Sequence, residues 1–248
     1  MRKESVLITA STTLCAPMFH DFEKKNDIFV HLPLEEFTAN VEKEESTLVL
    51  DNKDEFSFVI YGNVRNAQFF VNWMNKNNDL EPFKNAVHLA LDKPTAEFLE
   101  EHSIPAIMPR EKAKPIDLLE FMLRISREGK SLYPCSDQKT EEMPGLLQEL
   151  EMDVVEFSVC KEKSLDSTRL ETFRKEVQNL DISAVLFHNR SSVTRIKTAF
   201  PDIDLQTKKI ISGSPGVTKS LIDLGIEPNY EADGNWYSIG ELIEEKFL

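Results

Sequence analysis

Small hydroxyl and amide side chains gather in short loops, each of which follows an apolar run and precedes an amphipathic segment. Such loops lead into helix N-termini, where backbone N–H groups without partners in the helix accept anions. Arg65 and Arg190 add a cation to two of these loops. The residue types therefore predict a binding site for an anionic ligand. The candidate binding residues are Thr9, Ser11, Asn63, Arg65, Thr95, Ser136, His188, Asn189, Arg190, Ser191, Ser214 and Thr218.

The same side chains also have a purely structural interpretation. A Ser or Thr at a helix start serves as an N-cap worth about 1 kcal/mol, and this alternative stays open for each of them. His188 ends an apolar run inside a candidate loop, so a site role and a structural role are both open for it. His88 lies within an apolar run and is expected to be a core residue whose nitrogens have partners.

Motifs for several other chemistries are missing from the sequence. It contains neither Gly-x-x-x-x-Gly-Lys-Ser/Thr nor Gly-x-Gly-x-x-Gly, which disfavours nucleotide chemistry. Its histidines and cysteines form no His-x-x-x-His or Cys-x-x-Cys pair, so we expect no metal site. A receiver-like signalling module is disfavoured because no acidic pair with a lysine stands at the strand ends. Cys15, Cys135 and Cys160 are odd in number and far apart, which argues against a disulfide framework.

Acidic residues outnumber basic ones by 43 to 29, which gives a formal net charge of −14. Nucleic acids and anionic membrane surfaces both attract Lys and Arg, so neither is an expected partner. No run approaches the roughly 18 apolar residues that a membrane span needs. The first residues lead straight into a strand-like run without the features of a secretory signal. We therefore expect a cytoplasmic protein, and we expect it to be a monomer.

Short apolar runs alternate with amphipathic segments along the 248 residues, which predicts strands followed by helices. The predicted strands are Val6–Ala10, Ile28–Val30, Thr47–Leu50, Phe56–Tyr61, Ala86–Leu91, Ala106–Met108, Ser131–Tyr133, Val154–Val159, Ala184–Phe187 and Lys209–Ser212. The predicted helices are Pro17–Lys25, Asn66–Asn75, Lys93–Glu101, Ile116–Arg127, Met143–Glu151, Thr168–Asn179, Val193–Ala199, Val217–Leu224 and Ile239–Phe247. Strands such as Ala184–Phe187 are apolar at every position, which is typical of a parallel sheet covered on both faces. The pattern predicts an α/β fold.

The order of elements repeats within the chain. One passage runs from Phe56 to Pro105 and the other from Ile182 to Pro228. Each contains a strand, a helix, a second strand, a polar loop with a threonine, a short helix, and an isoleucine close to a proline. Two copies of one α/β unit predict two domains, and the crevice between them is the natural place for a ligand.

Three stretches of the sequence resemble the uroporphyrinogen-III synthase family. The segment Leu89–Leu99 is similar to the family's strand, turn and Thr-Ala-x-x-Leu helix start. Residues Leu132–Asp137, followed by Met143–Val155, resemble the strand, polar loop and helix before the family's return linker. Val6–Thr9 and Leu32–Phe37 resemble its first strand and outgoing linker. The resemblance covers nearly the whole chain in order and spacing.

The resemblance implies two flavodoxin-like parallel-sheet domains joined by a two-stranded antiparallel linker. Domain 1 is then discontinuous, formed by residues 1–34 and 162–248, and domain 2 spans residues 38–157. The linkers are expected at about residues 32–39 and 155–163.

The resemblance also implies a cofactor-free lyase reaction in tetrapyrrole and haem biosynthesis. Its substrate, hydroxymethylbilane, is a linear tetrapyrrole polyanion that loses its hydroxyl group and closes. The last pyrrole ring is inverted through a spiro intermediate, which gives uroporphyrinogen III. Holding the two ends of the substrate together would supply much of the rate. Handover of the substrate from hydroxymethylbilane synthase is a further expectation.

The sequence departs from the family pattern in places. The family's linker tyrosine falls on or near Cys160, whose thiol is a weak proton donor. The first strand ends in Thr9 and Ala10 where the family often has Thr-Arg, and residues 188–192 replace Thr-Ser-Pro-Ser-Gly. These differences favour an alternative, a catalytically silent protein of the same fold that binds a small anion or a tetrapyrrole. The intact order of both halves favours the enzyme.

Overall fold

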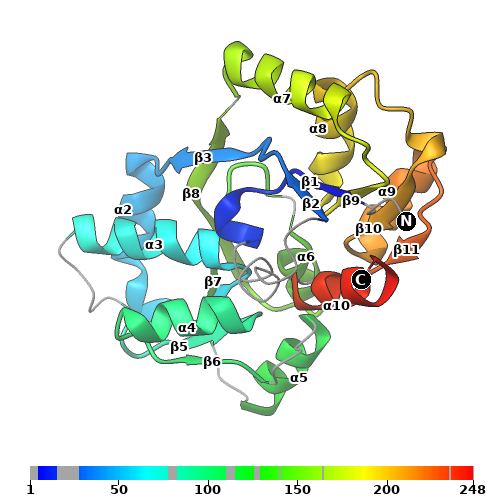
Figure 1. Ribbon diagram of the computed structural model, residues 1–248. Coiled ribbons are helices and arrows are strands. Elements are labelled where there is room, and N and C mark those ends of the chain that lie inside the picture. The colour runs from blue at the N-terminus through cyan, green and yellow to red at the C-terminus, as the bar shows by residue number, and fades with distance from the viewer. Residues whose placement is uncertain are drawn as a thin grey trace. The chain divides into compact units, whose positions relative to one another are not determined.

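A computed structural model describes residues 5–15, 28–77, 83–109, 115–125, 129–139, 141–163, 165–234 and 236–247. Strands and helices alternate along these residues, and helices pack on parallel strands (Figure 1). The predicted mixed α/β fold with parallel sheets is confirmed. The predicted helix Pro17–Lys25 lies outside the described residues.

Apart from α2, the helices begin and end close to the positions that the sequence predicts. Their bounds are α2 Lys43–Asp51, α3 Val64–Lys76, α4 Lys93–Glu101, α5 Pro115–Ile125, α6 Glu142–Glu149, α7 Ser167–Asn179, α8 Arg190–Ala199, α9 Pro215–Asp223 and α10 Trp236–Phe247. A helical turn at residues 12–15 and two 3₁₀ turns, Lys53–Glu55 and Leu205–Thr207, complete them. None of the helices in the described ranges is long and apolar enough to cross a membrane.

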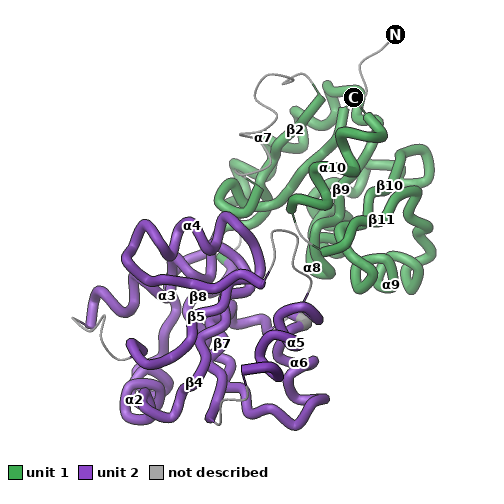
Figure 2. Tube along the Cα trace, turned by 90° about the horizontal axis from the view of Figure 1, so that it is seen from below, with its two compact units in different colours: residues 1–36, 163–248 green, residues 37–162 purple. Residues whose placement is uncertain are grey.

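The chain forms two compact units, which Figure 2 colours separately. Unit 1 consists of Met1–Glu36 and Lys163–Leu248, and unit 2 consists of Phe37–Glu162. The chain thus leaves unit 1 after Glu36 and returns to it after Glu162. Each unit has its own sheet and its own apolar cores.

Unit 1 is built on a five-stranded sheet. Its strands are β1 Val6–Ile8, β2 Phe29–His31, β9 Ala184–Phe187, β10 Lys209–Ser212 and β11 Tyr230–Glu231. They lie in the order β11-β10-β9-β1-β2, and each neighbouring pair is parallel. The chain proceeds outward in one direction from β9 and in the other from β1. The boundary between β9 and β1 is therefore the topological switch point of this sheet.

Both faces of the unit 1 sheet are covered, which explains why β1 and β9 are apolar at every position. Val6 and Ile8 of β1 enter a core with Ile243 of α10. Leu7, between them, enters a second core with Ile196 of α8 and with residues of α7 and α9. Alternate residues of one strand thus pack on opposite layers of helices.

Unit 2 is built on a six-stranded sheet. Its strands are β3 Glu36–Ala39, β4 Phe56–Tyr61, β5 Val87–Ala90, β6 Ala106–Ile107, β7 Lys130–Ser136 and β8 Val154–Lys163. They lie in the order β3-β8-β7-β4-β5-β6, and the pairs from β8 to β6 are parallel. The switch point of this sheet lies between β7 and β4. Phe58 and Ile60 pack with α5 and α6, whereas Val59 and Tyr61 pack with α3 and α4.

The predicted internal repeat is confirmed by the order of elements. Strands β4, β5 and β6 alternate with α3 and α4, and strands β9, β10 and β11 alternate with α8 and α9. The two short helices, α4 and α9, also end alike. Ser103 and Gly225 have left-handed φ angles of 61° and 72°. The amides of Ile104 and Ile226 then reach the carbonyl five residues earlier, both at 2.9 Å, which is a Schellman closure.

The predicted strand Thr47–Leu50 is wrong, because these residues belong to α2. A four-residue apolar run does not by itself distinguish a strand from a helix segment. In α2 only Val49 is buried, and Leu48 is 60% exposed, as expected on the two sides of a helix. Glu44 and Glu45 in the first turn favour a helix start through the helix dipole.

Candidate functional site

The candidate binding residues lie at the carboxyl ends of strands in both units. In unit 1 they follow β1, β9 and β10, and in unit 2 they end or follow β4, β5 and β7. Parallel strands place their carboxyl ends at one edge of the sheet. Each unit therefore collects its candidates at that edge of its own sheet. The unit 1 candidates are Thr9, Ser11, His188, Asn189, Arg190, Ser191, Ser214 and Thr218, and the unit 2 candidates are Asn63, Arg65, Thr95 and Ser136.

A buried carboxylate, which no sequence pattern indicated, organises the unit 1 edge. The side chain of Glu35 is fully buried just before β3. Its Oε1 accepts hydrogen bonds from His188 Nε2 at 2.5 Å, Asn189 Nδ2 at 3.2 Å and Arg195 Nη1 at 2.7 Å. Arg195, on α8, supplies the opposite charge that a buried carboxylate requires. Glu35 thus fixes three side chains around the start of α8.

The imidazole of His188 is held on several sides and is only 3% exposed. Because a carboxylate only accepts hydrogen bonds, Nε2 carries the hydrogen that points at Glu35. The ring of Trp236 stacks on the imidazole with a centroid distance of 5.7 Å and an interplanar angle of 27°. A Cβ atom at Gly213 would lie 3.0 Å from His188 Cα, so the backbone packs tightly there. The second ring nitrogen, Nδ1, is buried and makes no hydrogen bond within the described ranges.

The loop after β1 runs beside the loop after β9, since Leu7 pairs with Val185 in the adjacent strands. Thr9 is fully buried, and the Ser11 hydroxyl oxygen is also out of contact with solvent. Neither hydroxyl has a hydrogen-bond partner among the residues that the structure describes. Three buried polar atoms on the loops at the switch point of unit 1 therefore have no partner among the described residues: Thr9 Oγ1, Ser11 Oγ and His188 Nδ1.

The other unit 1 candidates take part in the start of a helix. Asn189 is the N-cap of α8, and its Oδ1 accepts from Ser192 N at 2.7 Å. Arg190 and Ser191 form the first turn that follows, with Arg190 exposed and Ser191 half-buried.

Ser214 is the N-cap of α9, and its Oγ accepts from Val217 N at 3.3 Å. Thr218 Oγ1 donates to Ser212 Oγ at 2.9 Å, which in turn donates to the Ser214 carbonyl at 2.9 Å. The hydroxyls of Ser214 and Thr218 thus serve a local capping network.

A second internal carboxylate organises the unit 2 edge. Glu141 lies between β7 and α6, and its Oε2 accepts a short hydrogen bond from the Tyr133 hydroxyl. Its Oε1 accepts from Asn66 Nδ2 at 2.6 Å and from Asn63 Nδ2 at 3.3 Å. A Cβ atom at Gly62 would lie 2.1 Å from the Tyr133 hydroxyl and 2.2 Å from Glu141 Oε2. Only glycine fits at that position while this network is in place.

The two carboxylates occupy corresponding places in the internal repeat. Asn63 caps α3 after β4, and Asn189 caps α8 after β9. Each asparagine accepts from the helix with its Oδ1 and donates with its Nδ2 to Glu141 or Glu35. The amide donors of Asn63 and Asn189 are therefore already bound to carboxylates of the chain itself.

Arg65 packs into the interior of unit 2 and is only 8% exposed. Its guanidinium lies 3.9 Å from the ring centroid of Phe37, and its Nε donates to Asn66 Oδ1 at 3.3 Å. Nearby, burial raises the pKa of the Cys160 thiol to about 11, although the charge of Arg65 acts in the opposite direction. The Cys160 thiol therefore stays protonated at neutral pH.

Thr95 is the third residue of α4, and Asp92 is the N-cap. The Thr95 amide donates to Asp92 Oδ1 at 2.8 Å, whereas its buried hydroxyl has no partner in the described part of the chain. Burial raises the pKa of Asp92 above its ordinary value of 3.8, while the hydrogen bond from the Thr95 amide lowers it. Ser136 ends β7 and is buried, and its carbonyl accepts from Lys139 N at 3.1 Å.

Several residues of these networks escaped prediction because they stand alone in the sequence. Glu35 and Arg195 are 160 positions apart, and Tyr133 lies on an apolar strand without a motif. The spacing of Asn63 and Asn66 is one signal in the sequence for such a network. Two asparagines three residues apart at a helix start can both donate to one acceptor, as these two do to Glu141. The unpredicted residues are Glu35, Asn66, Tyr133, Glu141 and Arg195.

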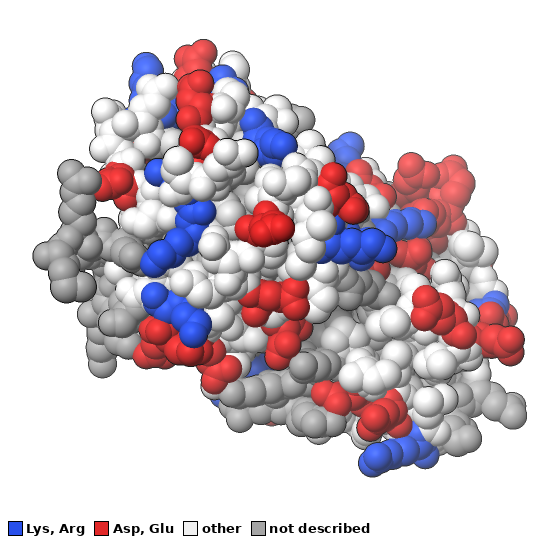
Figure 3. All heavy atoms as spheres, turned by 90° about the vertical axis from the view of Figure 1, so that its right-hand side faces the viewer, with Lys and Arg blue, Asp and Glu red and all other residues white. Residues whose placement is uncertain are grey.

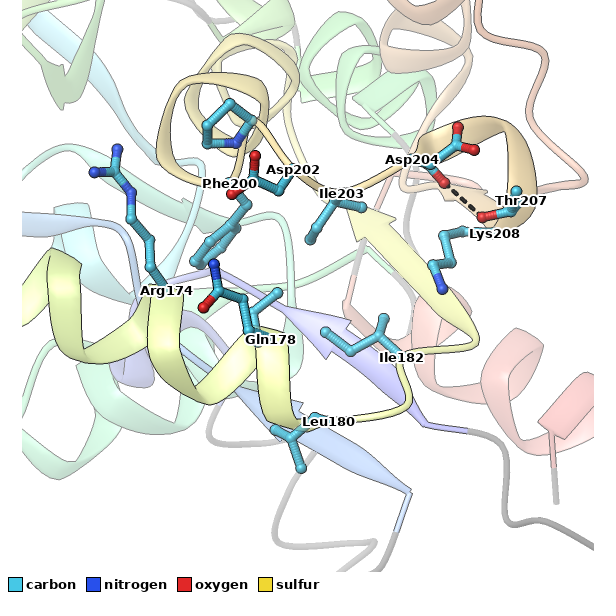
Figure 4. Close-up of a pocket in the computed structure, with 12 residues that line it drawn as sticks. Arg174, Gln178, Leu180, Ile182, Phe200, Asp202, Ile203, Asp204, Thr207 and Lys208 are labelled. Carbon is cyan, nitrogen blue, oxygen red and sulfur yellow. Dashed lines mark hydrogen bonds between the residues drawn. The ribbon is translucent and has the colours of Figure 1, made fainter.

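The pocket in Figure 4 lies away from these strand ends. It has a volume of about 230 Å³, and its lining includes the apolar side chains of Leu180, Ile182 and Phe200. Leu180 and Ile182 precede β9, and Lys208 precedes β10, so the pocket is at the amino edge of the sheet. Doubly wound sheets bind their ligands at the opposite edge. We therefore do not assign this pocket to the site.

The described residues offer no group of three or more His, Cys, Asp or Glu side chains that could hold a metal ion. On the face shown in Figure 3, acidic side chains are interspersed with basic ones, which is typical of a solvated surface.

Comparison with known proteins identifies relatives of this chain in sequence and in fold. The family model of uroporphyrinogen-III synthase HemD matches residues 20–243. The structure of uroporphyrinogen-III synthetase from Helicobacter pylori is 18% identical, with a TM-score of 0.61 over 98% of this chain and 99% of that one. A mutant uroporphyrinogen III synthase from the extremely thermophilic bacterium Thermus thermophilus is 13% identical, with a TM-score of 0.58 over 98% and 96% of the two chains.

A search of curated protein sequences gives no significant match. At these identities the two solved structures are informative about the fold alone, whereas the family model covers most of the sequence itself. The chain belongs to the uroporphyrinogen-III synthase family.

Proposed function

We propose that the chain is a uroporphyrinogen-III synthase, which converts hydroxymethylbilane to uroporphyrinogen III with loss of water and inversion of the last pyrrole ring. The match of the family model to residues 20–243 is the observation that carries this proposal. The reaction needs no cofactor, because the protein has to fold a flexible substrate, assist departure of a hydroxyl group and direct ring closure.

The strand ends of the two units supply polar groups suited to this substrate. Thr9, Ser11 and Thr95 carry buried hydroxyls that make no hydrogen bond inside the described structure. Asn63 and Asn189, in contrast, already donate to carboxylates of the chain. We assign the backbone amides at the helix starts to the substrate carboxylates, and the buried hydroxyls to other polar groups of the substrate.

The finer architecture is part of the same proposal. Unit 1 has the strand order 2-1-3-4-5 of flavodoxin, and the parallel strands of unit 2 have the related doubly wound order 3-2-1-4-5. We take units 1 and 2 as the two domains of the family. Residues 32–39 and 155–163 form the two-stranded antiparallel linker, supported by the position of β3 next to β8 and by the bond from Asn40 N to Val159 O at 3.1 Å.

The setting follows from the family as well. We propose a monomer that acts in the cytoplasm and receives its unstable substrate from hydroxymethylbilane synthase. A mixing experiment with that enzyme under dilution tests the handover, since a substrate that diffuses freely closes spontaneously to the type I isomer before it is captured.

A coupled assay tests the function directly. Hydroxymethylbilane, generated in place by hydroxymethylbilane synthase, is incubated with the full chain, and the uroporphyrinogen isomers are oxidised to porphyrins and separated by chromatography. We expect the type III isomer, with the type I isomer in controls that lack the chain or contain it heat-unfolded. If the native chain yields only type I, the enzymatic function is refuted, and binding of a tetrapyrrole in that case would identify a silent binding protein.

A further inference from the structure

The reaction needs a group that protonates the departing hydroxyl, and the obvious candidates in unit 2 are unsuited to this. Cys160 is fully buried and its pKa is raised to about 11 by burial. The Tyr133 hydroxyl donates its proton to Glu141, and burial together with that carboxylate raises the pKa of Tyr133 well above its ordinary value. Neither group gives up a proton readily near neutral pH.

The arrangement around His188 in unit 1 has the features of a proton donor. Nε2 is committed to Glu35, so any proton that the ring gains or loses must be on Nδ1. Trp236 covers one face of the ring, and the capping network of Asn189 fixes the backbone next to it. The imidazole therefore has one orientation and one exchangeable nitrogen.

The neighbourhood of that nitrogen indicates a ligand. Nδ1 is buried, has no hydrogen-bond partner in the described structure, and lies at the switch point of the sheet where ligands bind. The buried hydroxyls of Thr9 and Ser11, on the adjacent loop, also lack partners among described residues. Buried polar atoms are rarely left unsatisfied, so three of them on neighbouring loops point to a polar group that binds there.

We propose that His188 is the catalytic acid of the reaction, and that Glu35 is the positioning residue that orients it. This inference rests on the proposed function. Thr9 and Ser11 hold the hydroxymethyl oxygen against Nδ1. The positive charge of Arg195 lets Glu35 remain a carboxylate at this buried position.

In this step, the imidazolium Nδ1–H transfers its proton to the oxygen of the hydroxymethyl group. The C–O bond breaks, and its electron pair leaves with the oxygen as water. The pyrrole nitrogen supplies electrons to the carbon, which gives the cationic azafulvene. His188 is left neutral, and it regains a proton when the product pyrrole loses one after ring closure.

The first experiment compares H188Q with H88Q in the coupled assay. His88 is the matched control, because it is also a partly buried histidine but both its nitrogens have partners, the Tyr61 hydroxyl at 3.0 Å and the Phe83 carbonyl at 3.1 Å. We expect kcat for the type III isomer to fall about 100-fold or more in H188Q, as is usual for loss of a general acid, with KM changed only a few-fold. H88Q should keep the kcat of the unaltered protein.

The second experiment asks whether Glu35 acts through His188. In E35Q we expect a smaller fall in kcat than in H188Q, with little change in KM, because the amide oxygen still accepts from Nε2 but holds the ring less firmly than the carboxylate does. The double variant E35Q/H188Q should be no slower than H188Q alone. If the two substitutions instead damaged the structure independently, their effects on kcat would add in the double variant. That result would contradict a positioning role for Glu35.

A third experiment tests His188 without any substitution at Glu35, so it does not depend on the folding of E35Q. Added imidazole should restore part of the kcat of H188A, since the small acid replaces the deleted ring. Normal kcat in H188Q, or failure of imidazole to rescue a folded H188A, would overturn the assignment of His188. These outcomes differ from failure of the proposed function, in which the unaltered chain itself yields only the type I isomer.

Discussion

At the scale of single residues, Asn63 and Asn189 show how one side chain serves two neighbours. The oxygen of each amide caps a helix, and the nitrogen donates to a carboxylate far away in the sequence. Replacing either asparagine by aspartate would keep the cap but set two carboxylates against each other. The helix starts of this protein are thus tied to the rest of their unit through single amide groups.

Asp92, the N-cap of α4, carries a negative charge that its burial disfavours in the folded state. Burial raises its pKa above 3.8, so the folded state binds the proton more tightly than the unfolded state does. Its contribution to the free energy of unfolding therefore improves as pH falls through the raised pKa, and it is least favourable at neutral pH. We expect D92N, which keeps the oxygen that accepts from Thr95 N, to be more stable than the unaltered protein at pH 7.

Urea unfolding at a series of pH values measures this effect. The advantage of D92N should shrink as pH falls and vanish below about pH 3.8, where Asp92 is protonated in both states. D92A, which removes the cap as well as the charge, should be about 1 kcal/mol less stable than D92N. T95A should leave the cap intact, because the backbone amide of Thr95 donates the capping hydrogen bond. An advantage of D92N that is independent of pH would contradict the explanation.

At the scale of elements, the matching helix ends at Ser103 and Gly225 differ in their residue type. Both have left-handed backbones, which cost a residue with a Cβ atom about 1–2 kcal/mol relative to glycine. We expect S103G to raise the free energy of unfolding by about 0.5–1 kcal/mol, since the entropy of glycine in the unfolded chain offsets part of the gain. G225A should lower it by a similar amount or more. Thermal and urea unfolding of the two variants measures these changes in the free energy of unfolding. Changes of the same sign in S103G and G225A would contradict the prediction.

Sequence patterns predict elements well where burial is regular. The strands Phe56–Tyr61, Ala184–Phe187 and Lys209–Ser212 have the predicted bounds, because two helical layers demand apolar residues on both faces. The segment Thr47–Leu50 is too short and too exposed for its composition to indicate its structure.

The candidate site is predictable only in part. Its loops follow from the alternation of strands and helices, so the residues at the strand ends are found. Glu35 and Glu141 are not, since an isolated glutamate has no pattern and each joins partners about 75 to 160 positions away. Their networks depend on tertiary packing, which a local motif does not describe.

At the scale of the whole molecule, each unit has separate apolar cores, and this predicts separate responses to mutation. Ile243 is fully buried in a core of unit 1, and Leu99 is fully buried in a core of unit 2. Truncation of such a side chain costs about 2–5 kcal/mol. In hydrogen exchange followed by mass spectrometry, I243A should lose protection within Met1–Glu36 and Lys163–Leu248, and L99A within Phe37–Glu162. Loss of protection that spreads evenly over both units in either variant would contradict independent cores.

The pairing of β1 with β9 joins residues that leave the ribosome far apart in time, because Val6 meets Ala184. At about 5–20 residues per second, the N-terminal strand waits on the order of ten seconds for its neighbour. All of Phe37–Glu162 emerges during that interval and holds every parallel strand that its own sheet requires. We therefore expect Phe37–Glu162 to fold during synthesis before the N-terminal strand β1 can pair with β9.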